Sequence, residues 1–289
     1  MGRLHRTLLN LSAQPEEGVM LLRSAVRPIF PSILGTLALL LGAVPAVGQT
    51  HDEARATVGF AIGYIHGTSL WSVNRQPIIN LDLSQDLLNI QRTLTSNLTL
   101  SAQATYFRNS HFGYTGEFTY IGLGTEDACD LAGTAGGDPG GPACAALKGD
   151  TRPASAVSMM GGVILRPISR TAYQPYLKGL LGVALVPHST LLLAANWGTQ
   201  LENRMEIYTG TSSHMIRPAA TIGAGIATAP SAGYQLTAEV RETWAVMPVV
   251  TGPTQYQLLE PPSANRIKSF PSFLIGFNIV LERRRGRRY

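Results

Sequence analysis

The sequence predicts an all-β fold, an eight-stranded antiparallel up-and-down transmembrane β-barrel, from three observations. Several segments alternate apolar residues with small or polar ones, which is typical of strands that meet a different environment on each face. Short turns alternate with long loops between these segments. An export signal precedes them, and the rest of the chain has no apolar run long enough for a membrane-spanning helix.

The first element, residues 1–48, has the features of a secretory signal peptide. The stretch from Ile29 to Val47 is apolar apart from small residues, Arg23 and Arg27 precede it, and it ends in a small-x-small pattern at residues 46–48. The acidic residues before Met20 are foreign to such a signal, so we expect Met20 to be the true start. The alternative, a single anchor helix, fits poorly because the span is short and interrupted by prolines.

The net charge of +5 belongs to the ends of the chain. Four basic and two acidic residues precede the predicted cleavage point, and without them the charge falls to +3. Five arginines lie in the C-terminal tail, residues 283–289, and without these as well the body at residues 49–282 carries −2. We therefore expect no nucleic-acid partner.

Cys129 and Cys144 are the two cysteines of the chain. An exported protein folds where disulfides persist, so we expect a bridge that closes the flexible stretch between them. A metal site is the competing interpretation, but no other ligand lies near at suitable spacing. We expect no metal and no cofactor.

The strand pattern is clearest in the second half of the chain. In residues 234–240, Tyr234, Leu236 and Val240 share one face, while Gln235 and Thr237 share the other. The eight strands are expected near residues 55–66, 84–94, 97–108, 155–167, 173–186, 216–228, 234–247 and 269–282. The apolar faces are expected to meet lipid, because the opposite faces are rich in Gly, Ser and Thr, which suit the inside of a narrow tube. A soluble barrel or sandwich would alternate equally well and is the alternative.

The connections between the expected strands alternate between short and long. Short turns are expected at residues 95–97, 168–171 and 229–233, and the other four connections are longer. This is the layout of short periplasmic turns and long extracellular loops, with both chain ends in the periplasm. With this layout the chain resembles the small outer-membrane β-barrel proteins of Gram-negative bacteria, the OmpA/OmpX-like eight-stranded class, over about residues 54–282.

Aromatic residues near the presumed membrane borders support this resemblance: Trp71, Trp197, Trp244 and Tyr106. One departure is at the C-terminus: such barrels usually finish on an aromatic residue that closes the last strand, whereas here an arginine-rich tail lies between residues 281–282 and Tyr289. The resemblance implies an outer-membrane location, contact with lipid and lipopolysaccharide, insertion by the barrel-assembly machinery and a monomer. An extracellular ligand would bind through the loops at residues 108–154 and 187–215.

The polar side chains expected in the lumen are Gln103, Tyr176, Lys178, Glu239 and Arg241. Eight strands enclose an interior that side chains can fill, so the main hypothesis is a structural or surface-binding barrel with a closed, polar lumen. The first alternative is a narrow channel or carrier for small solutes. It depends on the small residues of the sixth strand, Ala219, Gly223, Gly225 and Ala227.

The second alternative is an enzyme that modifies outer-membrane lipid A. His188 and Ser189 are similar to the His-x-Ser arrangement of outer-membrane deacylases, but Ser189 adjoins His188 directly and Pro187 interrupts the strand. The carboxylate of Glu202 lies in a loop. A hydroxyl nucleophile needs an imidazole base in hydrogen-bond reach and an acid to orient it. We therefore expect no catalytic residue and no enzyme activity.

Overall fold

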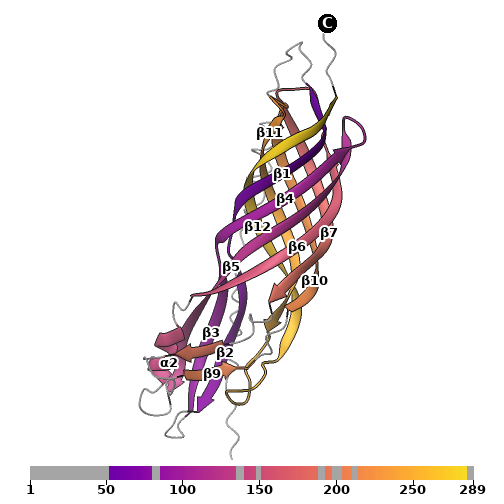
Figure 1. Ribbon diagram of the computed structural model, residues 1–289. Coiled ribbons are helices and arrows are strands. Elements are labelled where there is room, and N and C mark those ends of the chain that lie inside the picture. Colours follow the sequence, from indigo (N-terminus) through magenta and orange to yellow (C-terminus); the bar gives the residue numbers. More distant parts are fainter. Residues whose placement is uncertain are drawn as a thin grey trace, which may run out of the picture. The chain divides into compact units, whose positions relative to one another are not determined.

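The computed structural model describes residues 52–79, 85–134, 140–147, 151–187, 193–196, 204–209 and 214–284. The predicted signal peptide, the start at Met20 and the last five residues of the tail lie outside these ranges. Nearly all of the described chain forms antiparallel strands (Figure 1).

Eight of these strands close into a barrel. They are β1 (Glu53–Ile65), β4 (Asn97–Phe107), β5 (Phe112–Thr134), β6 (Thr151–Leu165), β7 (Tyr173–Pro187), β10 (His214–Thr228), β11 (Tyr234–Val250) and β12 (Ser263–Arg284). The order around the barrel is β5-β4-β1-β12-β11-β10-β7-β6, and β6 closes the ring by pairing with β5. The predicted eight-stranded antiparallel barrel is confirmed.

Two barrel strands continue beyond the ring. β2 (Ser69–Ile79) follows β1 after three residues and β3 (Gln85–Thr95) precedes β4 with one residue between them. β2 pairs with β3 as β1 pairs with β4, and the pairs Ile65–Asn97 and Ser69–Thr93 keep the same register. The prediction of a turn at residues 95–97 is therefore wrong, because the chain passes straight through this point.

β5 was not among the predicted strands. Residues 112–134 were expected to lie in an extracellular loop, but they form one strand that pairs with β4, β3 and β6. The short turn before it, residues 108–111, lies at the periplasmic end. The predicted number of eight barrel strands is nevertheless correct. The prediction counted β3 and β4 as two barrel strands, although the chain passes straight from one to the other, and it left out β5.

The two faces of the barrel wall have opposite character. Leu236, Val240 and Ile275 are 53–57% exposed on the outside, whereas Thr237 and Asn278 are 8% and 5% exposed on the inside. This confirms the predicted orientation, with apolar side chains outward. The outward-facing tyrosines at the periplasmic strand ends form part of an aromatic girdle: Tyr106, Tyr114, Tyr173 and Tyr234.

The extracellular part of the chain folds into a second layer, which we call the head. It contains β2, β3, the distal half of β5, helix α2 (Gly140–Leu147) and the hairpin of β8 (Leu193–Asn196) and β9 (Arg204–Tyr208). These elements lie together at one end of the barrel (Figure 1). Their shared core includes Leu70, Val73, Ile90, Leu147 and Ile207.

The head changes the interpretation of two predictions. Trp71 is 4% exposed in the core of the head and so does not mark a membrane border, and Trp197 lies outside the described residues. Tyr106 and Trp244 face outward on the barrel, as expected.

At the other end of the barrel, β12 runs to Arg284, so the first two arginines of the predicted tail are paired with β1.

Candidate functional site

The centre of the barrel holds four charged side chains from three strands. Glu117 on β5 accepts from Lys178 on β7 at 2.7 Å and also forms an ion pair with Arg241 on β11. Lys178 also binds Glu239 on β11 at 2.9 Å. Their side chains are at most 6% exposed. Two acids and two bases make the cluster neutral, as a buried site requires.

Neutral polar groups surround this lumen cluster. The hydroxyl of Tyr176 donates to Glu239 at 2.9 Å, and the hydroxyl of Thr119 donates to Glu117 at 2.8 Å. Arg241 donates to the Ser272 hydroxyl at 3.3 Å. These bonds fix the orientation of the charged groups, because a buried polar network is stable only when its members are paired.

Of the lumen residues expected from sequence, four lie in or against this cluster. Gln103 lies nearer the periplasmic end, where it donates to Asn278 at 3.1 Å. Glu117 was missed, although it binds both bases, because its strand was taken for a loop. The alternation of Tyr114, Phe118 and Tyr120 with polar residues around Glu117 was the signal that could have found it.

The small residues of β10 make room for this cluster. A Cβ atom on Gly225 would lie 2.5 Å from Cζ of Tyr176, and one on Gly223 would lie 2.8 Å from Oε1 of Glu239. The space beside these two glycines is therefore occupied by the large side chains of β7 and β11.

Apolar side chains fill the barrel on the extracellular side of the lumen cluster. Ile121, Met160, Leu180, Met247 and Phe270 are all buried there, and they belong to the same apolar cluster as the core of the head. The sequence predicted a polar lumen throughout, so the apolar filling of the extracellular half differs from the prediction. Apolar filling is possible because the head shields it from water.

Two small cavities lie within the barrel. One, of about 30 Å³, lies between the lumen cluster and the periplasmic turns and is lined by polar groups such as Gln103 and Asn278. The other, of about 20 Å³, lies among apolar side chains near Phe270. Each has room for only one or two water molecules.

Arginines close the periplasmic end of the barrel. The guanidinium of Arg166 lies 3.7 Å from the ring centroid of Phe107 and donates to the Ala54 carbonyl at 3.3 Å. Burial lowers the pKa of Arg166 to about 10, so it stays charged at neutral pH. Arg170 forms an ion pair with Glu53 at 2.6 Å.

The head has its own buried ion pair. Arg92 on β3 donates to both carboxylate oxygens of Asp127 on β5, at 2.6 and 2.7 Å, and its guanidinium carbon lies 5.3 Å from the Trp71 ring centroid. Both charged side chains are at most 1% exposed. Such bidentate pairing fixes the register of β3 against the distal half of β5.

Glutamines join the loop at residues 251–262 to the edge of β2. The side chain of Gln257 donates to the Ile79 carbonyl at 2.8 Å and accepts from its N–H at 2.7 Å. Gln76 is fully buried and accepts from the Thr254 N–H and the Tyr208 hydroxyl, both at 2.9 Å. Burial raises the pKa of Tyr208, so its hydroxyl stays protonated as a donor.

Cys129 and Cys144 form the predicted disulfide, which joins β5 to α2. A flexible stretch was expected between them, but it contains the end of β5 and the first half of α2. The bridge therefore fastens a helix to the head.

Replacing both cysteines by alanine is expected to lower the stability of the head by about 3 kcal/mol, from the entropy of the freed loop. Hydrogen exchange of the α2 amides measures this loss, and the β10 amides provide the internal control. Unchanged protection of α2 would contradict a stabilising role for the bridge.

His188, Ser189 and Glu202 lie outside the described residues. In the part of the chain that the structure describes, no group of three or more His, Cys, Asp or Glu residues is placed to hold a metal ion. No helix there is long and apolar enough to cross a membrane.

The closed ring of strands, the apolar exterior and the polar centre define a small transmembrane β-barrel of the outer-membrane type, because a membrane barrel faces lipid with apolar side chains and satisfies its backbone between strands. No protein-family model matches the chain, and no curated protein matches its sequence.

Solved structures of several small outer-membrane proteins are similar to this chain. Neisserial surface protein A is 10% identical with a TM-score of 0.40, covering 78% of this chain and 97% of its own. OprG from Pseudomonas aeruginosa is 10% identical with a TM-score of 0.44, covering 81% and 98%. Ail of Yersinia pestis is 13% identical with a TM-score of 0.32, covering 78% and 98%. Likenesses of this size carry no information about ligand or activity.

Proposed function

We propose that the protein is a closed, non-conducting barrel of the outer membrane, with a structural or surface-binding role carried by its head. The observation that supports this most is the filled interior. Charged side chains occupy the middle, apolar ones occupy the outer half, and the cavities of about 30 and 20 Å³ have no room for a solute.

The surface of the head supports a binding role. Tyr256, Leu258 and Leu259 are 44–58% exposed in the loop at residues 251–262. Leu258 has a φ of 66°, which costs energy for a branched residue, and it is held there by a hydrogen bond from its N–H to the Ile207 carbonyl at 3.2 Å. The fold therefore holds apolar side chains toward solvent, where a partner could cover them.

Planar-bilayer recording tests the closed state. The purified full-length protein is expected to give no steady ion conductance, while a general porin inserted under the same conditions provides the positive control. Steady conductance would contradict the proposal and favour the narrow channel, in which case the lumen cluster would have to move aside.

A further inference from the structure

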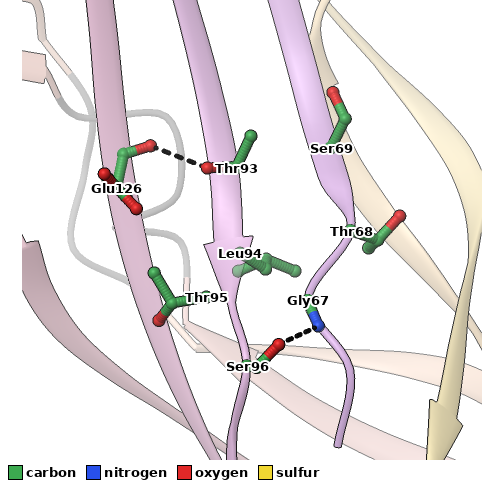
Figure 2. A pocket seen from close by; sticks show the side chains of 8 residues that line it. All are labelled: Gly67, Thr68, Ser69, Thr93, Leu94, Thr95, Ser96 and Glu126. Carbon is green, nitrogen blue, oxygen red and sulfur yellow. Dashed lines mark hydrogen bonds between the residues drawn. The ribbon is translucent and has the colours of Figure 1, made fainter.

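A hollow of about 320 Å³ opens in the barrel wall where the ring of strands meets the head. We call it the wall hollow. It is lined by the connection between β1 and β2, the end of β3 and one residue of β5 (Figure 2): Gly67, Thr68, Ser69, Thr93, Leu94, Thr95, Ser96 and Glu126.

The wall hollow exists because the strand pairing loosens at this level. Between β1–β4 and β2–β3, the remaining contacts are a bond from the Leu94 N–H to the Thr68 carbonyl at 2.8 Å and one from the Gly67 N–H to the Ser96 hydroxyl at 3.0 Å. On the other side, residues 96–98 stand opposite only residues 122–123 of β5, which makes a β-bulge. Bulges redirect side chains and recur beside binding sites.

Gly67 is required for this arrangement. A Cβ atom at this position would lie 2.0 Å from the Leu94 carbonyl oxygen. Only glycine lets the two chains approach at the floor of the wall hollow.

The lining has the chemistry of a site for a polyhydroxyl compound. Five of its side chains carry a hydroxyl and one carries a carboxylate. Within the described chain, the side chains of Thr68, Ser69 and Glu126 make no hydrogen bond to protein, whereas Thr93 donates to the Glu126 carbonyl at 3.3 Å. Neutral donors and acceptors with one carboxylate suit sugar hydroxyls better than an anion or an acyl chain.

The position of the wall hollow indicates how such a sugar would be presented. It lies immediately beyond Tyr64 and Leu98, a cross-strand pair that is 51% and 58% exposed on the outside of the barrel. These two residues belong to the apolar surface that meets lipid, so the hollow lies at the level of the headgroups. Lys268 is next to it and donates to the Ser69 carbonyl at 2.8 Å.

We propose that the wall hollow binds a sugar ring of an outer-leaflet glycolipid whose acyl chains lie against the wall near Tyr64 and Leu98. This rests on the proposed function, in which the head lies outside the cell. The glycolipid would then be held by hydrogen bonds from the loosened strands.

The test uses the full-length protein in detergent micelles, with rough lipopolysaccharide as the probe. Ser69→Phe fills the wall hollow, and Glu126→Gln removes its charge while keeping its shape. Ser72→Phe is the matched control, because Ser72 is exposed on the same strand β2 but does not line the hollow. Heat-modifiable migration on a gel verifies that each variant is folded.

Ser69→Phe is expected to weaken lipopolysaccharide binding about tenfold, which corresponds to the loss of one or two hydrogen bonds, while Ser72→Phe binds as the wild type does. Delipidated core oligosaccharide should compete, and phosphatidylglycerol vesicles should not. Equal binding by the wild type, Ser69→Phe and Glu126→Gln would overturn the proposal, as would competition by phosphatidylglycerol alone.

Conductance of the same samples separates the two proposals. A conducting protein that binds sugar at the wall hollow contradicts the closed barrel only. A silent barrel whose binding ignores Ser69→Phe contradicts the wall hollow only.

Discussion

Replacing Glu117 by alanine is expected to lower the free energy of unfolding of the barrel by about 3–5 kcal/mol. The carboxylate is the shared partner of Lys178 and Arg241, and its side chain is fully buried. Without it, two positive charges face one remaining acid, Glu239, in a site that water hardly reaches. Urea unfolding in detergent, followed by tryptophan fluorescence and by the gel shift of the folded form, measures the change.

The matched control for this prediction is Glu126→Ala, which removes an exposed carboxylate from the same strand. Its effect should stay within about 0.5 kcal/mol, because surface substitutions away from special features rarely cost more. Equal stability of Glu117→Ala and Glu126→Ala would show that the lumen cluster does not stabilise the barrel.

Replacing Asp127 by alanine is expected to destabilise the head by a similar amount, about 3–5 kcal/mol, and to leave the barrel folded. The change removes the bidentate carboxylate from the Arg92 guanidinium, which is buried against the Trp71 ring; in the native pair both charged side chains are at most 1% exposed. Hydrogen exchange should show loss of protection in β2 and β3, while the β10 and β11 amides keep theirs.

Asp130→Ala is the matched control, because Asp130 is exposed three residues further along β5. It should leave the exchange of β2 and β3 unchanged. If Asp127→Ala also left them unchanged, the buried pair would have no part in holding the head. If it unfolded β10 and β11 as well, the head and barrel would form a single cooperative unit.

The alternation of side chains was enough to predict the barrel, because a strand with lipid on one face must repeat every second residue. The same signal was present around Glu117, but its neighbours Tyr114 and Tyr120 are aromatic and Gly116 is small. Such a composition is also common in binding loops, so the segment was taken for one. Glu117 could then not be placed in the lumen, although its three partners in the cluster were.

The wrong prediction of a turn at residues 95–97 has a physical reason. Turns and bulges both favour small polar residues, because both leave backbone groups that such side chains can satisfy. Here Ser96 accepts from the Gly67 N–H and the strand continues. The head was not predicted, because its core consists of contacts between segments that lie far apart in the chain, such as Trp71 with Tyr208.

The uninterrupted course of β5 has a mechanical consequence. Twenty-three residues run without a break from the periplasmic turn into the head, with bonds to β4 and then β3 along one edge and to β6 along the other as far as residue 126. A pull on the head directed along this strand would load those bonds in parallel, in shear, so that many would have to fail together. The connection between head and barrel would therefore resist such tension far better than a flexible linker would. The force from a surface bound by the head would pass directly to the strands of the barrel wall.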